Sequence, residues 1–240
     1  MRKFFEIGGV VAGAVLIAFG IAAIVMGVNG RSTVSDSLKQ EQITGTPDMT
    51  PAAIAGEVTA AKQAQSKLFS QLKAAGSNLT PSPIETPTCS VANKLVDTGS
   101  EARCFAKYMR IHTFGATSGL TYSQMGRYLA KPNTPLQSTD GLGATNDPKY
   151  AVTDPKTQQP VSNGRRDLWV TETALTTALN TSYMADQLGL FGIVVGIALL
   201  LSGIGFAVLA VGGTLRNAEP ALKLFGARTP KAAGKAIPTA

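Results

Sequence analysis

The chain has 240 residues, of which 44% are hydrophobic and 15% are charged, with a formal net charge of +7 and a single histidine. An average soluble domain carries about 25% charged residues, and the deficit here comes from two stretches without any charge, residues 7–28 and 188–215. A run of about 20 apolar residues spans a bilayer as a helix, so the composition excludes an ordinary soluble enzyme and predicts a mainly α-helical protein with two transmembrane helices.

Residues 7–28 form the first predicted span, after a short N-terminal segment at residues 1–6. Arg2 and Lys3 also resemble the start of a cleaved signal peptide, whose apolar part is usually about 7–15 residues long. This run is longer, and no A-x-A cleavage site follows it. We therefore interpret it as an uncut anchor, with cleavage as the alternative.

The segment between the spans, residues 29–187, begins and ends with helical patterns. Val34 and Leu38 lie at helical spacing after the first span, and Leu179 lies on the approach to the second. We expect two helical stalks that are continuous with the spans. Asp167 is the expected cap of the second stalk helix.

The clearest helix of this segment opens at Thr50 and Pro51. Thr50 is a suitable N-cap, and proline suits the first helical position. Gly76 is the expected C-terminal stop. A mostly apolar stripe alternates by four and three residues, as one face of a helix does: Ile54, Val58, Ala61, Gln65, Leu68 and Leu72.

Both cysteines, Cys89 and Cys104, fall between the spans. An even number of cysteines in an oxidising compartment predicts a disulfide, and a loop of this length gains about 3 kcal/mol from closure in the chain-entropy model. Two free thiols are the alternative. The spacing is wrong for a C-x-x-C redox pair, and one histidine cannot complete a Cys/His zinc site.

After Cys104 the pattern turns helical again, with Tyr108 and His112 on one side of the helix. Residues 121–129 predict another short helix. The side chains expected to point inward there are Tyr122, Met125 and Leu129. Residues 131–165 contain five prolines and several turn dipeptides, and we expect a long irregular loop that is mobile in part.

Glycines recur every seven residues in both spans. They are Gly13, Gly20 and Gly27 in the first span, and Gly189, Gly196 and Gly203 in the second. Small residues on one face let helix backbones approach closely in lipid, and a seven-residue spacing fits a left-handed crossing. We expect these faces to pack, against the other span or against a second copy of the chain. The alternative is that glycine is simply common in spans.

The distribution of basic residues predicts the orientation of the chain in the membrane. The C-terminal tail, residues 216–240, carries five basic residues and one acidic residue, whereas residues 29–187 carry 15 basic and 13 acidic residues. Segments rich in Lys and Arg stay in the cytoplasm. We therefore expect a two-pass protein of the plasma membrane with both termini cytoplasmic and an extracytoplasmic domain between the spans.

The lipid bilayer is the one partner that the sequence predicts directly. Basic residues near the membrane surface attract anionic lipid, which accounts for the charge of the tail. The tail has a single aromatic residue and no recognisable nucleic-acid-binding motif, so nucleic acid is not an expected partner.

No residue pattern predicts a catalytic residue, a metal site or a cofactor. His112 is the only histidine, which excludes a two-histidine iron site and leaves a packed helix position as the simpler interpretation. Ser70 and Lys73 form an S-x-x-K without the companion S-D-N and K-T-G elements of the penicillin-binding enzymes. Neither span contains an ionisable residue, which argues against a transporter.

The whole arrangement resembles a group of small actinobacterial membrane proteins with a span, an ectodomain and a second span near the C-terminus. The resemblance rests on SLKQEQIT, on LTYSQM and above all on the block LWVTETALTTALNTSYMADQLGLFGIVVGIALLLSGIGF. Some relatives carry the label aromatic ring-opening dioxygenase, which the single His112 does not support. The resemblance implies an actinobacterial envelope protein and no particular activity.

Together these patterns predict a non-enzymatic cell-envelope protein. Its extracytoplasmic domain is expected to be small, mostly helical and disulfide-bonded, and to bind a protein partner, form a homo-oligomer or organise a complex. The alternatives are an accessory subunit of a larger membrane complex and, in third place, an envelope enzyme or ligand binder.

Overall fold

The computed structural model describes residues 2–212, which divide into two compact units. The first, called the span unit here, comprises the described parts of Met1–Val28 and Phe191–Ala240, and the second, the central domain, is Asn29–Leu190. The predicted tail at 216–240 and the last residues of the second predicted span, 213–215, lie outside the described residues.

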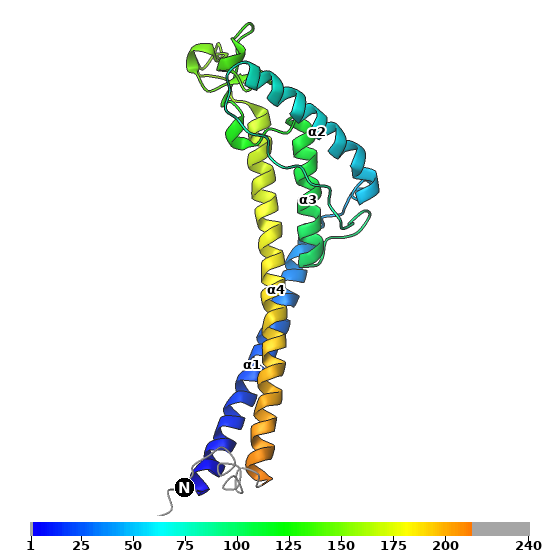
Figure 1. The fold of residues 1–240 in the computed structure, drawn as a ribbon, viewed down its shortest axis with the longest axis vertical. Coiled ribbons are helices and arrows are strands. Elements are labelled where there is room, and N and C mark those ends of the chain that lie inside the picture. The colour runs from blue at the N-terminus through cyan, green and yellow to red at the C-terminus, as the bar shows by residue number, and fades with distance from the viewer. Residues whose placement is uncertain (1, 213–240) are drawn as a thin grey trace, which may run out of the picture. The chain divides into compact units, whose positions relative to one another are not determined.

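Four α-helices make up most of the described chain (Figure 1). They are α1 (Arg2–Glu41), α2 (Pro51–Ala74), α3 (Gly99–Ala116) and α4 (Gly164–Val211). Between α3 and α4 lie three short 3-10 turns, η1 (Tyr122–Gln124), η2 (Leu136–Ser138) and η3 (Pro148–Tyr150), and two antiparallel strands, β1 (Tyr128–Leu129) and β2 (Ala144–Thr145). The prediction of a mainly helical protein is confirmed.

Both α1 and α4 are long and apolar enough to cross a membrane. Only 11% of the most apolar stretch of α1 and 17% of that of α4 is buried, so neither is the core helix of a soluble domain. Large apolar side chains are exposed instead, with Phe19 at 66% and Phe191 at 65%. Each helix also extends beyond its apolar run, because α1 is unbroken as far as Glu41 and α4 begins at Gly164.

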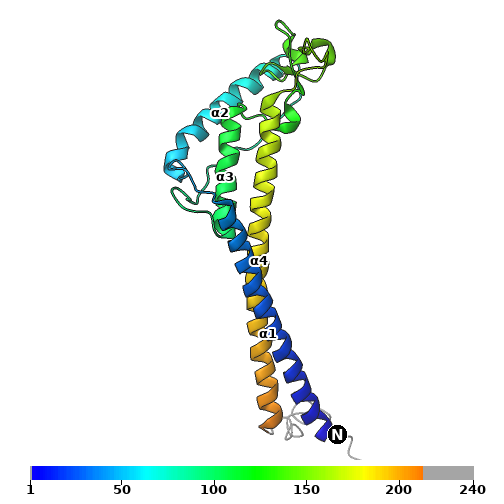
Figure 2. The same ribbon diagram turned by 180° about the vertical axis from the view of Figure 1, so that it is seen from behind.

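In the central domain, α3 lies between α2 and the first half of α4, as the two opposite views show (Figures 1 and 2). The predicted stripe of α2 is buried, from Ile54 at 1% exposure to Leu72 at 2%, and Phe69 joins it. Thr50 caps the helix, since its side chain accepts a hydrogen bond from the backbone N–H of Ala53 at 3.1 Å. These predictions for α2 are confirmed.

The only tryptophan fixes α3 against α4. The Trp169 side chain is 3% exposed, and its indole N–H donates to the backbone carbonyl of Leu120 at 2.8 Å. Its ring meets that of Phe114 edge to face, with centroids 5.3 Å apart. A buried aromatic residue whose polar atom is hydrogen-bonded adds a large buried apolar area to a core, and the hydrogen bond fixes the orientation of the ring.

Where α1 and α4 pass through the central domain, a salt bridge joins them. The Arg31 side chain donates from Nε to Oδ1 of Asp186 at 2.9 Å. Asp186 is largely buried, with 9% of its side chain exposed, whereas 40% of the Arg31 side chain is exposed. Both residues lie just outside the uncharged runs of the sequence.

The start of α4 differs from the prediction. Asn163, rather than Asp167, provides the cap, because its Oδ1 accepts from the backbone N–H of Arg165 at 3.1 Å. Its amide nitrogen also donates to the carbonyl of Gly126 at 2.9 Å. Asn163 is buried, so its contact with Gly126, which is distant in the sequence, helps to fix the residue at which α4 begins.

The segment between α3 and α4 also differs from expectation. Residues 121–129 form the turn η1 and the strand β1 instead of a helix. Of the three side chains expected to point inward only Met125 is buried, whereas Tyr122 is 44% and Leu129 is 37% exposed. The predicted loop at 131–165 has little regular structure, yet it folds around the buried Asp140. This carboxylate accepts backbone hydrogen bonds from Gly126, Leu142 and Ala144.

Candidate functional site

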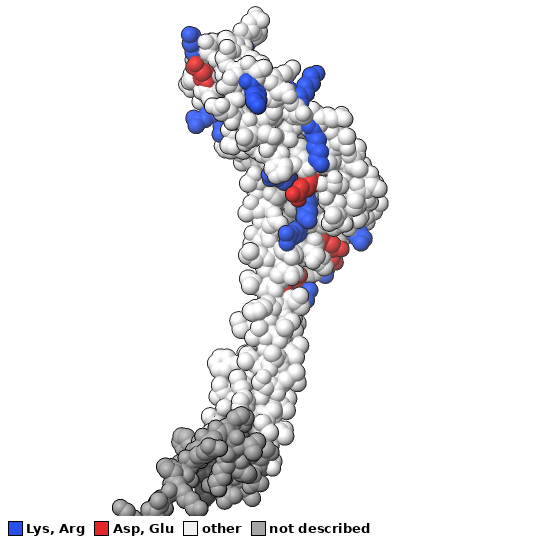
Figure 3. Space-filling model, in the orientation of Figure 1, with Lys and Arg blue, Asp and Glu red and all other residues white. Residues whose placement is uncertain are grey.

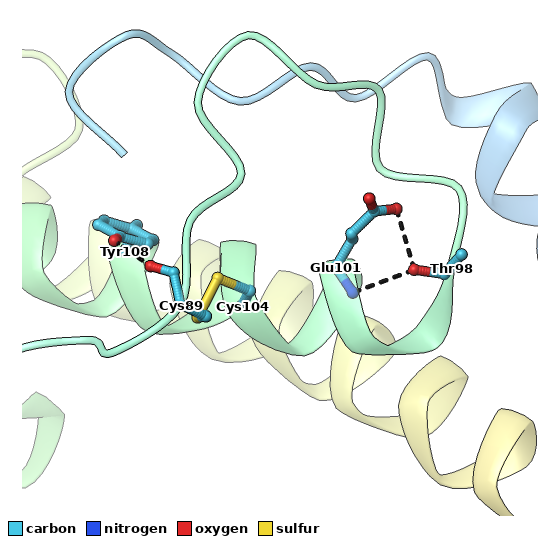
Figure 4. The surroundings of a disulfide bond; sticks show 5 residues. All are labelled: Cys89, Thr98, Glu101, Cys104 and Tyr108. Atoms are coloured by element: carbon cyan, nitrogen blue, oxygen red, sulfur yellow. Dashed lines mark hydrogen bonds between the residues drawn. A yellow bond between two sulfur atoms is a disulfide. The ribbon is translucent and has the colours of Figure 1, made fainter. Parts of the chain in front are cut away.

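Cys89 and Cys104 are joined in a disulfide, as predicted (Figure 4). The bond ties the irregular segment before α3 to the second turn of that helix. Tyr108, one turn further on, donates its hydroxyl to the backbone carbonyl of Cys89 at 2.6 Å. Burial, and then the negative charge of Asp48, raises the pKa of the Tyr108 phenol. The disulfide therefore has a structural setting, with its neighbouring backbone held by a buried hydroxyl.

The predicted glycine faces of the span unit lie against each other. A Cβ added at Gly13 would lie 2.8 Å from the carbonyl oxygen of Gly203, and one added at Gly20 would lie 2.7 Å from that of Gly196. Moving seven residues along α1 thus corresponds to moving seven residues back along α4, which is an antiparallel register. Each of these four glycines is buried.

The remaining two predicted glycines, Gly27 and Gly189, contribute less to the close contact between α1 and α4. Gly27 is buried, and its Cα would lie 3.8 Å from a Cβ added at Gly192. Gly189 is half-buried. In α4 the buried series of small residues continues towards the C-terminus through Ala210, which is 1% exposed. An alanine at this spacing serves the same close approach as a glycine.

His112 lies between two carboxylates rather than in a packed position. Its Nε2 is 3.3 Å from Oδ2 of Asp48, and its Nδ1 is 3.0 Å from Oε2 of Glu57. With 31% of its side chain exposed, the histidine links α3 to α2 and to the segment before α2. The interpretation of His112 as a packed residue is corrected by this geometry.

Asp48, Glu57 and His112 are also the one group of three residues in the described chain that could hold a metal ion. A metal takes one ring nitrogen, with the other ligands converging on the same point. Here the two carboxylates lie at different ring nitrogens of His112, with Asp48 at Nε2 and Glu57 at Nδ1. A hydrogen bond from the Thr46 side chain, helped weakly by the charge of His112, lowers the pKa of Asp48 below its ordinary value of 3.8.

Three cations follow one another along the exposed side of α3. Arg103, Lys107 and Arg110 are spaced by four and three residues, so they share one face of the helix. We call them the α3 basic face. All three are exposed, and none takes part in an ion pair with another described residue. Figure 3 shows several Lys and Arg side chains over α3, with an acidic side chain among them.

Aromatic rings hold the two arginines of the α3 basic face in place. The guanidinium carbon of Arg103 lies 4.5 Å from the centre of the Tyr183 ring. That of Arg110 lies 5.1 Å from the ring centres of both Phe114 and Trp169. Stacking orders a guanidinium while its N–H edge stays free to bind a carboxylate or phosphate.

A cavity lies on each side of the α3 basic face. One, of about 410 Å³, is bounded by the proline-containing segment from Pro83 to Thr88, together with Lys107 and Arg110. The other, of about 240 Å³, lies between α3 and α4 and is lined by all three cations. We call this second cavity the Glu172 slot, because the side chain of Glu172 forms part of its wall.

Glu172 is 2% exposed, and its Oε1 accepts no hydrogen bond from any described residue. Its other oxygen receives a long hydrogen bond of 3.4 Å from the Thr173 hydroxyl, and the Thr176 hydroxyl also lies close enough to act on the carboxyl group. Burial raises the pKa of Glu172 above its ordinary value of 4.5, and the charge of Arg110 acts in the opposite direction. A buried carboxylate oxygen without a hydrogen-bond partner lowers the stability of the fold, so the burial of Glu172 calls for an explanation.

Sequence reasoning missed both the α3 basic face and the Glu172 slot. The spacing of Arg103, Lys107 and Arg110 was visible in the sequence, but cations on the outer face of a helix usually indicate only solvation. Nothing near Glu172 in the sequence signals burial.

No protein-family model, curated protein or solved structure matches the chain.

Proposed function

We propose that the chain is a non-enzymatic protein of the cell envelope, anchored by two spans, whose central domain binds an anionic envelope component through the α3 basic face. The single observation that carries this proposal is the row of three exposed cations, none of which forms a salt bridge with another described residue. Two of them are pre-ordered by aromatic stacking, which reduces the entropy lost when an anion binds.

Two features support an extracytoplasmic position of the central domain. A disulfide joins Cys89 to Cys104, and disulfides persist in oxidising compartments outside the cytosol. The basic tail at 216–240 favours cytoplasmic termini by the positive-inside rule. The resemblance to actinobacterial two-span proteins fits the same location.

The test uses the full-length chain in nanodiscs of zwitterionic lipid, mixed with an envelope fraction of the source cells and sedimented. The variant R103E/R110E reverses two charges of the α3 basic face. The matched control, K62E/K73E, makes the same change of net charge on α2, where both lysines are exposed. We expect the wild type and the control to sediment with the envelope fraction and R103E/R110E to stay in solution.

Salt provides the second measurement, because interactions between exposed charges are screened within about 8 Å at physiological ionic strength and more strongly above it. Sedimentation of the wild type should decline steeply as salt is added. If R103E/R110E sediments as well as the wild type, or if the α2 control loses binding to the same extent, the α3 basic face is not the binding surface. Binding that survives both variants would favour the accessory-subunit alternative, with the spans as the contact.

A further inference from the structure

The Glu172 slot is a small cavity with cationic side chains on one wall and a carboxylate with neutral polar side chains on the other. The cations Arg103, Lys107 and Arg110 line it from α3, and Glu172, Thr176 and Asn180 line it from α4. Its volume of about 240 Å³ is below the range of about 300–1,000 Å³ that is usual for drug-sized ligands. An occupant must therefore be small, of the size of a headgroup or a single sugar unit.

The buried carboxylate defines what the occupant must offer. Oε1 of Glu172 has no hydrogen-bond partner among the described residues, although 98% of the residue is shielded from solvent. A ligand that donates a hydrogen bond to this oxygen would remove the cost of leaving it unpaired. The hydroxyl of Thr176 and the amide of Asn180, on the same wall, suit further hydroxyl groups.

The cations define the other end of the occupant. Planar guanidinium groups and a lysine ammonium are the donors that proteins use for phosphate and carboxylate. Three cations against one carboxylate leave the slot net positive, so an ammonium group is a poor donor for Glu172 there. A neutral hydroxyl meets the carboxylate without repulsion from the arginines. A phosphate group, whose oxygens accept strong hydrogen bonds from guanidinium and ammonium groups, suits the three cations.

We propose that the Glu172 slot binds a phosphorylated polyol, with the phosphate on the α3 basic face and a hydroxyl donated to Glu172. This inference rests on the proposed function, because it names the anion that the α3 basic face would take. A phosphorylated polyol occurs as a free, doubly charged monoester and as the singly charged phosphodiester headgroup of a phospholipid, and the two sources are separated by experiment.

The experiment measures the affinity of the full-length chain, in nanodiscs of zwitterionic lipid, for glycerol 3-phosphate, inorganic phosphate and glycerol. A hydrogen bond to a charged group contributes about 1.5–3 kcal/mol, which is a factor of about ten or more in affinity. We expect glycerol 3-phosphate to bind at least about tenfold more tightly than inorganic phosphate, and glycerol alone to bind undetectably.

Two variants separate this inference from the proposed function. Glu172→Met keeps the approximate shape and removes the buried carboxylate, so the fold should not be weakened. It should bind inorganic phosphate as the wild type does and lose the roughly tenfold preference for the polyol phosphate. R103E/R110E should lose both ligands. Thermal unfolding of each variant in the same nanodiscs confirms that it is folded.

The outcomes are distinct. If wild type binds inorganic phosphate and glycerol 3-phosphate equally, or if Glu172→Met keeps the preference, the slot inference fails while the proposed function stands. If the wild type binds neither glycerol 3-phosphate nor inorganic phosphate, both the slot inference and the proposed function fail.

A second experiment identifies the source of the ligand by comparing vesicles that contain phosphatidylinositol with free inositol 1-phosphate. Tighter binding to the vesicles indicates a lipid headgroup, and equal binding indicates a free ligand. Either result supports a phosphorylated polyol.

Discussion

Glu172 lies 2% exposed between α3 and α4, with one oxygen that accepts no hydrogen bond from the described chain. Its pKa is raised above 4.5 because burial disfavours the charged form. A carboxyl group of this kind stabilises the fold when it is protonated. Its contribution is fully present below the unfolded pKa and is lost as the pH rises through the higher pKa of the folded state.

We predict that Glu172→Gln changes the pH dependence of stability in this direction. Below pH 4.5 the wild type and the variant should unfold at similar temperatures, because both side chains are then neutral. As the pH rises towards neutrality, the variant should become the more stable of the two. Thermal unfolding in detergent across this range measures the gap. A gap that shrinks with rising pH would show that Glu172 is stabilised as the anion.

Helix contacts in the span unit depend on the absence of side chains at particular positions. Gly203 faces the backbone of α1, where a Cβ would lie 2.7 Å from the carbonyl oxygen of Gly13. Gly205, two residues further along α4, has no atom within 4 Å of the place where a Cβ would be. The two glycines therefore form a matched pair in the same helix, one at the contact and one away from it.

Gly203→Leu should separate the helices, whereas Gly205→Leu should be tolerated. The expected loss for a large residue at a filled contact is on the order of 1–3 kcal/mol, and leucine is compatible with lipid at either position. Thermal unfolding of both variants in the same detergent measures the difference. Equal stabilities would mean that α1 and α4 are not held together by this face.

At the scale of elements, α2 could be predicted from the sequence because its determinants are local. Thr50, Pro51 and the apolar stripe each indicate a helix, and the core lies on the expected side. The start of α3 could also have been found. Thr98 caps this helix, because its hydroxyl accepts from the backbone N–H of Glu101 at 3.3 Å and donates to the Glu101 carboxylate at 2.9 Å (Figure 4). The T-x-x-E spacing behind these contacts is visible in the sequence.

Other elements depend on contacts between distant residues and could not be predicted. Asn163 caps α4 and is also bonded to Gly126, whereas the sequence alone led us to expect Asp167 as the cap. Asp140 organises residues 126–144 through backbone donors on both sides of it. The partners of His112 are 55 residues away in Glu57 and further still in Asp48. Such pairings arise only when the helices have packed.

At the scale of the whole molecule, two spans that both cross the bilayer leave the two ends of the chain on the same side of it. We predict that a reporter fused after Ala240 is active only in the cytoplasm and that one inserted at Asn146, which is exposed, is active only outside. The physical reason is the cost of moving the basic tail across the membrane. An insertion at Asn133, in another exposed turn of the same segment, is the control and should give the same result as Asn146.

A cytoplasmic readout at both insertion sites would reverse the orientation. It would also place the disulfide between Cys89 and Cys104 in a reducing compartment, where such bonds rarely persist. Alkylation of the two cysteines in membranes isolated without reductant provides an independent check, since an intact disulfide leaves no thiol to label.

The salt bridge between Arg31 and Asp186 joins residues that are 155 positions apart in the sequence. A ribosome makes α1 first and completes α4 only after the entire central domain has emerged. The contact cannot form before Asp186 has been synthesised, so a newly inserted α1 waits in the bilayer with its glycine face uncovered. During that interval it is open to pairing with other helices or to recognition by quality-control proteases, and the rate of synthesis of the central domain sets how long the exposure lasts.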